Sequence, residues 1–323
     1  MGVKKALNNL CFGVACVVAF CVCAAVSGLG AIFVKIERPY RYLKVDRDES
    51  VWKAVYDLDS NGKDAAKFDL YLPANADPNK NYSLIFYIHG GGFTSGDKAD
   101  GKRWGPYYAS KGIVVASANY TLAKGDGAAN INTMRDELID VMQAVKSYCA
   151  KEGYNITEMA TTGGSAGGCL AMVCAYREPD KLPIPVKFVF EQTGPASFEP
   201  DGWGLTNDKD RAEFVSLMTG RKIAAADVGS EEYQSAIDEI SPATLVNENS
   251  VPTILAYGSR DAVVPPDLKR SLLDNLDKRG VVHDYIEFPH SGHGLLDDLD
   301  KSEEFYKRTD EYIARYFDNF KER

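Results

Sequence analysis

One short stretch limits the fold of this chain more than any other. TTGGSAGGCLAM, residues 161–172, places four glycines around a single serine. The run before it, ITEMATT, is typical of a buried strand, and the run after it, CLAMVCAYRE, is typical of a helix. Glycine inside a helix costs about 1 kcal/mol relative to alanine, yet Gly167 and Gly168 fall in the expected first turn. The stretch therefore predicts a tight strand-to-helix turn around Ser165.

Ser165 has the surroundings that a serine nucleophile needs. A hydroxyl is a weak nucleophile, so it requires exposure, a base and donors for the developing negative charge. Gly163 and Gly167, two residues to either side, leave room for a turn that exposes Ser165 at the sheet edge. The helix points its N–H groups at the site, which makes the N–H of Ala166 a candidate oxyanion donor. The alternatives are close packing or a phosphate loop, but P-loop and G-x-G-x-x-G spacings are absent from the stretch.

A second glycine run, HGGGF at residues 89–93, directly follows another predicted strand. Successive glycines allow backbone N–H groups to turn towards a ligand that side chains would block. Together with the serine turn, the run predicts that the N–H groups of Gly91 and Gly92 join that of Ala166 around one oxygen. A flexible glycine loop is the alternative. We interpret His89 as a residue that holds this loop, and not as a base.

An acid and a base are expected after the serine, in the chain order Ser, Asp or Glu, His. Asp261 follows the predicted strand in VPTILAYGSRD, at the carboxyl edge where ligand sites of open α/β sheets lie. His293 lies deepest in the loop FPHSGHGL after the last predicted strand, so we predict it as the base, with His290 as a supporting or surface residue. A metal site at both histidines is the alternative, although no H-E-x-x-H or Cys/His set supports it. We predict neither a metal nor a cofactor.

Strand-like and helix-like runs alternate along the rest of the chain. VWKAVYDL and KFDLYLP, joined by a turn with Asn-Gly, predict an antiparallel hairpin at residues 51–72. The later runs predict a mostly parallel sheet with helices on both faces. Residues 198–241 interrupt the alternation and are expected to form a partly helical insertion over one end of the sheet. Phe93, Tyr120 and Trp203 are candidates for a substrate pocket, with plain core packing as the alternative.

The N-terminal segment differs from the rest of the chain. Residues 10–34 contain no charged residue over 25 positions, and a helix of that length spans about 30 Å of hydrocarbon. We predict a membrane anchor in residues 1–35, or alternatively a cleaved signal segment. Residues 36–49 would be a linker, and residues 50–323 a catalytic domain outside the cytoplasm, either membrane-anchored or secreted.

Charge and cysteine content exclude two other kinds of protein. Residues 1–35 hold three of the 37 basic residues and none of the 46 acidic ones, so the remaining chain has a net charge of −12. Nucleic-acid binding is therefore not expected, since phosphate contacts need clustered Lys and Arg. An odd count of three cysteines after this segment, at helical positions, predicts buried thiols and no disulfide framework.

Taken together, these segments resemble the α/β-hydrolase superfamily. HGGGF, GGSAGG, DAVVP and SGHGL follow one another over about residues 50–320. Within the superfamily the chain is similar to the hormone-sensitive-lipase-like and the feruloyl- or acetyl-esterase-like carboxylesterases. The segment ANYTLA, residues 118–123, also resembles this group. The resemblance implies an α/β-hydrolase fold with a mostly parallel sheet, an antiparallel N-terminal hairpin and a short lid insertion. Gly164 replaces the Asp that is usual in the lipase group, and the hairpin replaces its helical cap. Both differences favour the carbohydrate-esterase-like branch and the exopeptidase-like relatives over a lipase.

The resemblance also implies an activity. It points to a serine carboxylesterase that cleaves short-chain acyl esters through an acyl-enzyme, with acetylated or feruloylated carbohydrate as candidate substrates. Ser165 would attack the ester, His293 would move the proton, and Asp261 would orient the imidazolium. The residues implied to shape the loop and the turn are His89, Gly90, Gly163, Gly164 and Gly167. The alternatives are a serine exopeptidase of the prolyl-oligopeptidase type and a non-catalytic, membrane-anchored binding module.

Overall fold

A computed structural model describes residues 38–44, 50–62 and 66–320. The predicted anchor at residues 10–34 lies outside these ranges and stays a prediction. Among the residues that the structure describes, no helix combines the length and apolar character needed to cross a membrane. Contacts divide the chain after Arg41, within the short 3₁₀ helix η1 (Arg38–Tyr42), and apart from this helix the account below concerns the unit that begins at Tyr42.

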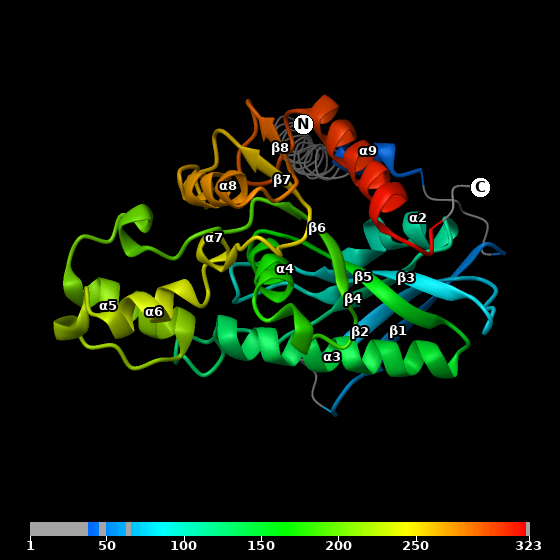
Figure 1. Cartoon of the computed structure of the whole chain (residues 1–323), viewed down its shortest axis with the longest axis horizontal. Coiled ribbons are helices and arrows are strands. Elements are labelled where there is room, and N and C mark those ends of the chain that lie inside the picture. The colour runs from blue at the N-terminus through cyan, green and yellow to red at the C-terminus, as the bar shows by residue number, and fades with distance from the viewer. Residues whose placement is uncertain (1–37, 45–49, 63–65, 321–323) are drawn as a thin grey trace, which may run out of the picture. The chain divides into compact units, whose positions relative to one another are not determined.

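A single eight-stranded sheet forms the centre of this unit (Figure 1). Its strands lie in the order β1-β2-β4-β3-β5-β6-β7-β8. β2 pairs antiparallel with both β1 and β4, whereas every later pair is parallel, which confirms the predicted parallel sheet with an N-terminal hairpin. The strands are β1 (Trp52–Asp59), β2 (Lys67–Pro73), β3 (Asn81–Ile88), β4 (Val114–Ala118), β5 (Asn155–Gly164), β6 (Val186–Gln192), β7 (Thr253–Gly258) and β8 (His283–Phe288).

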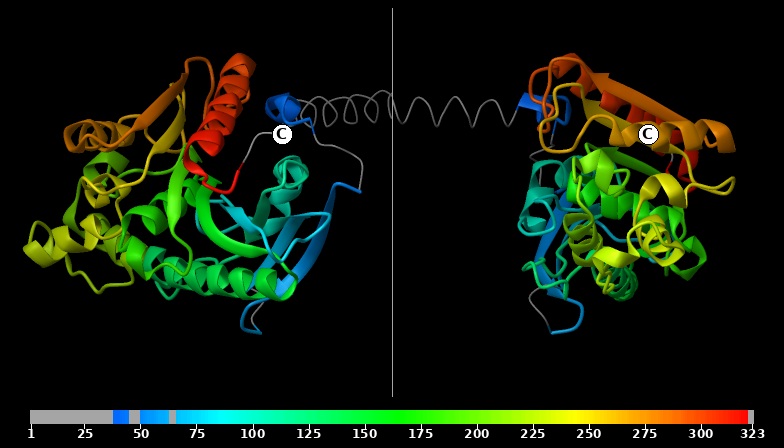
Figure 2. Two further views of the ribbon diagram at one scale, coloured as in Figure 1. Left: turned by 45° about the vertical axis from the view of Figure 1, so that its right-hand side comes forward. Right: turned by 90° about the vertical axis from the view of Figure 1, so that its left-hand side faces the viewer.

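Helices cover both faces of the sheet, as the two views in Figure 2 also show. α3 and α4 pack against β5 on one face, where α7 contacts both α4 and α8. α2 and α9 lie on the other face. The helices are α2 (Gly105–Ser110), α3 (Ile131–Lys151), α4 (Ala166–Tyr176), α5 (Asp208–Thr219), α6 (Glu231–Asp238), α7 (Pro242–Leu245), α8 (Leu268–Arg279) and α9 (Leu299–Tyr316). Short 3₁₀ helices are η1 (Arg38–Tyr42), η3 (Lys98–Arg103), η4 (Pro179–Lys181), η5 (Pro200–Trp203) and η6 (Ala225–Asp227).

Burial explains why the inner elements are apolar throughout. β4 and β7 are buried at every position because helices cover both faces of the sheet, whereas the edge strand β1 is mostly half-buried or exposed. α4 is buried at every position between the sheet, α3 and α7, which is where a helix apolar on all sides belongs. Cys149, Cys169 and Cys174 are free and buried, as predicted.

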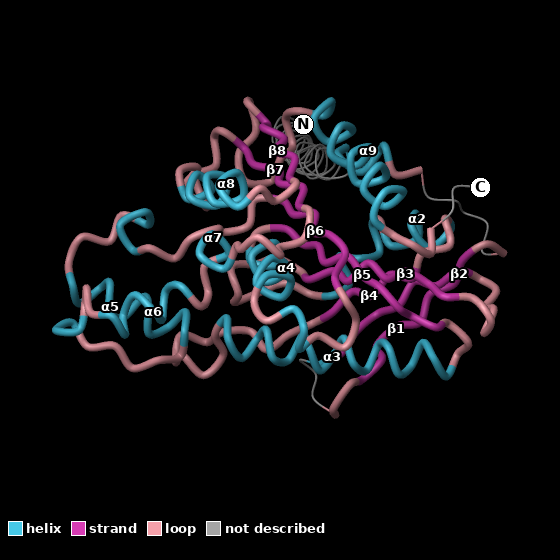
Figure 3. The backbone as a smooth tube through the Cα atoms, viewed as in Figure 1, coloured by secondary structure: helices cyan, strands magenta, loops and turns pink. Residues whose placement is uncertain are grey.

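The segment between β6 and β7 contains several short helices in place of a single crossover helix. It comprises η5, α5, η6 and α6, followed by α7. Figure 3 shows α5 and α6 beyond the ends of the strands, where α5 contacts the fold through α3. This segment covers most of the predicted insertion at residues 198–241 and is helical in part, as expected.

Candidate active site

Ser165 lies in the turn between β5 and α4, in a strained backbone conformation. Its φ is 55° and its ψ is −127°, which L-residues seldom adopt and which costs about 1–3 kcal/mol. The N–H of Ser165 donates to the carbonyl of Gln192 at 2.7 Å, and its own carbonyl accepts from the N–H of Cys169 at 3.1 Å. The neighbouring strand β6 and the helix α4 therefore hold the turn from both sides.

Close packing explains three glycines around this turn. A Cβ added to Gly167 would lie 2.0 Å from the carbonyl oxygen of Ile88, and one added to Gly163 would lie 2.4 Å from the carbonyl carbon of Gly167. A Cβ on Gly90 would lie 2.7 Å from the carbonyl oxygen of Gly164. Any side chain at these positions would push β3, β5 and α4 apart.

Gly164 differs from the other glycines of the predicted turn. The nearest atom to a Cβ added there is the carbonyl oxygen of Gln192, at 3.8 Å, which is an ordinary contact. Its backbone φ lies outside the left-handed region. The structure thus gives no steric reason for glycine at position 164, unlike the prediction that placed it with Gly163 and Gly167.

Ser165, His293 and Asp261 form a chain of hydrogen bonds across the sheet edge. His293 Nε2 lies 2.8 Å from Ser165 Oγ, and His293 Nδ1 lies 2.8 Å from Asp261 Oδ2. A carboxylate can only accept, so Nδ1 carries the proton and Nε2 is free to accept from the serine hydroxyl. The structure therefore brings together the three residues predicted from β5, β7 and β8, which lie as far as 128 positions apart.

The surroundings of Asp261 keep it ionised. Its side chain is 1% exposed, and this burial would raise its pKa. The hydrogen bond from His293 and those from the N–H groups of Val264 and Val263 outweigh burial and hold the pKa of Asp261 below its usual value. The two N–H groups donate to Asp261 Oδ1 at 3.0 and 2.8 Å. A fixed negative charge thus faces the imidazole ring.

The glycine loop after β3 lies against the serine. A Cβ added to Gly90 would be 3.4 Å from Ser165 Cβ. Gly91 and Gly92 have φ values of 114° and 60°, and a Cβ on Gly91 would lie 2.1 Å from the carbonyl oxygen of Ser95. The N–H of Ser95 donates to the carbonyl of Gly91 at 3.0 Å and closes the loop. The predicted oxyanion donors therefore belong to segments that flank Ser165.

His89 and Tyr120 support this loop from inside. His89 is 1% exposed, and its Nδ1 lies 2.8 Å from the carbonyl oxygen of Gly90. Burial lowers the pKa of His89, which keeps the ring neutral. Tyr120 stacks on this ring with centroids 4.3 Å apart, and its hydroxyl donates to the carbonyl of His89 at 3.0 Å. Tyr120 was predicted as a pocket wall but is 2% exposed, so it stiffens the loop from behind.

The other predicted pocket residues belong to an aromatic cluster. Phe93 packs against Phe198 with ring centroids 6.3 Å apart, and Phe198 stacks on Trp203 at 6.1 Å. The indole N–H of Trp203 donates to the carbonyl of Ser197 at 3.0 Å. These contacts connect the glycine loop to the segment between β6 and β7.

His290 has a different partner from His293. Its side chain is 66% exposed, and its Nδ1 lies 2.7 Å from Asp298 Oδ1. Asp298 also accepts from the hydroxyl of Ser291 at 2.6 Å and from the N–H of His290 at 3.0 Å. Asp298 therefore ties together the loop that carries His293. Sequence reasoning missed it, and the position of Asp298 before α9 gives no signal of this role, because its side chain makes no capping hydrogen bond to that helix.

Glu191 is a second residue that sequence reasoning missed. It is fully buried beneath the turn, and its Oε2 accepts from the N–H of Gly194 at 2.7 Å. A Cβ on Gly168, in the first turn of α4, would lie 2.7 Å from this oxygen. Burial raises the pKa of Glu191 to about 8, so it is a neutral acid at pH 7. In VKFVFEQ a single acid within an apolar strand carries no signal of this role.

The chain matches a known protein family over most of the segments that carry this site. A family model described as BD-FAE matches residues 68–276, which is more than half of the chain and includes Ser165 and Asp261. The chain belongs to the BD-FAE family. The matched range ends before His293, which the fold returns to the same site.

Within the described residues, no group of three or more His, Cys, Asp or Glu side chains is placed to hold a metal ion.

Curated relatives of this BD-FAE chain include esterases and peptidases. The probable carboxylic ester hydrolase LipM of Mycobacterium tuberculosis is 26% identical over 272 residues, which cover 81% of this chain and 60% of that protein. Dipeptidyl-peptidase 5 of Aspergillus fumigatus is 26% identical over 235 residues, covering 69% of this chain and 30% of that protein. The chain thus spans 60% of the length of the first relative and 30% of the length of the second.

Solved structures share the fold at low sequence identity. A truncated form of a carbohydrate esterase from gut microbiota has a TM-score of 0.65 at 18% identity, with 84% of this chain and 99% of that chain covered. Esterase B from Lactobacillus rhamnosis, bound to an inhibitor, has a TM-score of 0.64 at 17% identity, with 91% and 96% covered. The fold of this BD-FAE chain is therefore the α/β-hydrolase fold that the resemblance implied.

Proposed function

We propose that the protein is a serine carboxylesterase that hydrolyses short-chain acyl esters. The observation that carries the proposal is the unbroken hydrogen-bond chain from Ser165 through His293 to Asp261, next to a loop of glycines. A nucleophile, an oriented base and converging N–H groups are the parts that acyl transfer requires. Relationship to a probable carboxylic ester hydrolase supports the same reaction.

In the first half-reaction, Ser165 Oγ attacks the carbonyl carbon of the ester while His293 Nε2 takes its proton. The carbonyl oxygen becomes an oxyanion, to which the N–H groups of Gly91, Gly92 and Ala166 donate. The tetrahedral intermediate then collapses, the bond to the alcohol oxygen breaks, and His293 gives its proton to that oxygen. One oxyanion donor is worth about 3 kcal/mol in reactions of this kind.

In the second half-reaction, water replaces the alcohol. His293 Nε2 takes a proton from the water as its oxygen attacks the acyl carbon, and the bond from that carbon to Ser165 Oγ then breaks. The proton returns to Oγ, and the carboxylic acid leaves. Asp261 stabilises the imidazolium twice in each cycle because its charge lies against Nδ1.

The alcohol half of the substrate is proposed to be a carbohydrate. The support is the structural relationship to a carbohydrate esterase, together with Gly164 at the position where the resemblance to the hormone-sensitive-lipase group leads us to expect Asp. Acetylated and feruloylated xylo-oligosaccharides are the test substrates. Release of acetate from the first or of ferulate from the second would support the assignment. Efficient cleavage of nitrophenyl acetate without any release from either oligosaccharide would contradict the carbohydrate assignment.

A serine exopeptidase is the second candidate, since dipeptidyl peptidases are among the relatives at 26% identity. Both reactions would use the same acyl-enzyme chemistry, so the two differ in what the pocket holds. Xaa-Pro nitroanilides, assayed beside nitrophenyl acetate, separate them. We expect cleavage of the ester, with no cleavage of the amide.

The assignment of the nucleophile is tested by covalent labelling. A fluorophosphonate probe should label the protein but not the Ser165→Ala variant, and labelling that survives in this variant would refute the assignment. His293→Ala should abolish turnover of nitrophenyl acetate. His290→Ala is the matched control, because His290 bonds to Asp298 and not to Ser165, and it should retain most of the turnover.

A further inference from the structure

An apolar cavity of about 140 Å³ lies against the glycine loop. Gly92 and Phe93 of that loop form one wall, and Ile131 and Met134 at the beginning of α3 form another. Met218, near the end of α5, lines the cavity from the side of the insertion. The cavity therefore shares Gly92, a proposed oxyanion donor, with the site at Ser165.

The polar groups in the lining are already bonded within the protein. Asn130 accepts from the first turn of α3, and its Nδ2 donates to the carbonyl of Gly127 at 3.0 Å. The hydroxyl of Thr94 donates to the carbonyl of Gly91 at 3.4 Å. The other lining side chains are apolar, so a hydrocarbon group fits this space better than a sugar or a charged group.

The sheet topology indicates which half of an ester faces the cavity. In the proposed mechanism the leaving oxygen must reach His293 Nε2, whose loop follows β8 at one end of the sheet. Apart from Leu217 and Met218 of α5, the lining of the cavity belongs to segments that follow β3 and β4, on the other side of β5. With the carbonyl oxygen held at Gly91 and Gly92, such a substrate directs its acyl group towards the cavity and its alcohol away from it.

The volume limits the size of this acyl group. An engineered apolar cavity of about 150 Å³ holds one benzene molecule, so the space here accommodates about six carbon atoms. An acetyl group would leave most of it empty, whereas a feruloyl group or a long fatty acyl chain would exceed it, so of the two oligosaccharide esters named above the cavity favours the acetyl ester. Met134 and Met218 are flexible side chains that adapt to the shape of an apolar ligand.

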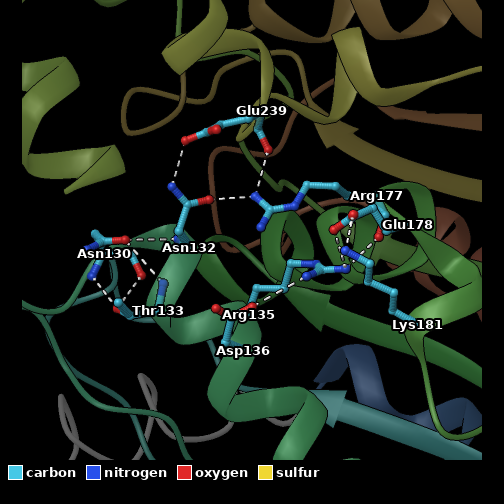
Figure 4. A network of polar contacts seen from close by, with 9 residues as sticks. All are labelled: Asn130, Asn132, Thr133, Arg135, Asp136, Arg177, Glu178, Lys181 and Glu239. Atoms are coloured by element: carbon cyan, nitrogen blue, oxygen red, sulfur yellow. Dashed lines mark hydrogen bonds and ion pairs between the residues drawn. The ribbon is translucent and has the colours of Figure 1, made fainter. Parts of the chain in front are cut away.

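A polar network holds the α5 wall in place, and Figure 4 shows the part of it around Asn132, Arg177 and Glu239. Asn132 Nδ2, at the beginning of α3, donates to Glu239 Oε1 at 2.8 Å. It also donates to the carbonyl of Thr219 at 2.9 Å. Arg177 Nη1 donates to Asn132 Oδ1 at 2.5 Å. Arg221 Nε donates to Glu239 Oε1 at 3.1 Å. These bonds join the end of α5 to α3 and α4, so the cavity does not depend on a ligand to form it.

We propose that this cavity is the acyl-binding subsite, that it takes an apolar acyl group of up to about six carbon atoms, and that Met218 sets its depth. This proposal rests on the proposed esterase function and specifies the acyl group of its substrate. Each buried methylene raises kcat/KM about fourfold. Nitrophenyl esters should therefore be cleaved with increasing kcat/KM from acetate through butanoate to hexanoate, and with a much lower value for decanoate.

Two substitutions at Met218 test the subsite. Met218→Trp fills the cavity, so the ratio of kcat/KM for hexanoate to that for acetate should fall by about tenfold or more. Met218→Ala enlarges it, so the preferred chain should become longer. Glu213→Trp, at an exposed position on the same helix, is the matched control and should keep the wild-type ratio.

A second series of acetate esters with different alcohols completes the test. Met218→Trp should leave the order of preference within this series as it is in the wild type. A change among the alcohols with no change among the acyl chains would overturn the acyl assignment, as would equal effects on acetate and hexanoate. If the wild-type protein cleaves no ester in either series, the proposed function fails as well, and the two failures are thereby distinguished.

Discussion

Replacing Glu191 by Gln should change how the stability of the protein depends on pH. Glu191 is fully buried, and burial raises its pKa while the hydrogen bond from the N–H of Gly194 lowers it. Burial dominates, so the pKa rises from 4.5 to about 8. The amide oxygen of Gln can still accept from the N–H of Gly194, so the variant removes the titration with little change in packing.

The sign and size of the effect follow from this shift. Between pH 4.5 and about 8 the folded protein keeps the proton on Glu191, whereas the unfolded chain has lost it. The unfolded state then binds fewer protons, so this group lowers the free energy of unfolding as the pH rises. Its contribution is fully present below pH 4.5 and is lost towards pH 8. At about 1.4 kcal/mol per pH unit, the loss between about pH 5 and about pH 7.5 is about 3 kcal/mol.

Chemical denaturation of both proteins at several pH values measures this contribution. The difference in free energy of unfolding between Glu191→Gln and the wild type should move by about 3 kcal/mol in favour of the variant from about pH 5 to about pH 7.5. All other titrating groups cancel in the difference. The infrared band of the protonated carboxyl should be missing from the variant. A difference that stays constant to within about 0.5 kcal/mol would refute the neutral, buried acid.

Two further predictions concern the site itself. In Asp261→Asn, the N–H groups of Val263 and Val264 hold the amide oxygen, so the amide NH₂ faces His293. The imidazole then takes the opposite tautomer, and kcat should fall by about 10⁴-fold. A loss of less than about tenfold in steady-state esterase assays would contradict this. Gly167→Ala should destabilise the fold by about 3 kcal/mol, because its Cβ meets the carbonyl oxygen of Ile88. Gly164→Ala should change the free energy of unfolding by less than about 1 kcal/mol. Equal melting temperatures for the two variants would contradict the packing argument.

Local patterns in the sequence predict much of the fold and identify Ser165, Asp261 and His293 as candidates for the site. The hairpin and the Ser165 turn are encoded within a few residues of their own positions, so spacing is enough to find them. Asp261 and His293 follow predicted strands, and parallel strands place their carboxyl ends at one edge. The structure indeed joins both to Ser165.

The parts that could not be predicted depend on contacts between distant segments. Tyr120 is an aromatic residue next to a motif, and only its stacking on His89, 31 positions away, shows that it supports the loop. Glu191 has an unusual role because α4 covers it, and no local pattern reports that coverage. The reverse holds for Gly164, which shares a motif with Gly163 but lacks its crowded surroundings.

The arrangement of the triad along the chain has a consequence for biosynthesis. Ser165 belongs to the middle of the sheet, whereas its proposed base comes 128 residues later, after the last strand. A nascent chain in which β5 and α4 have already formed still lacks the group that takes the proton. In the proposed mechanism the hydroxyl therefore becomes reactive only when β8 has docked at the sheet. Fluorophosphonate labelling then reports completion of the C-terminal edge, and the emerging enzyme cannot attack esters while it is being made.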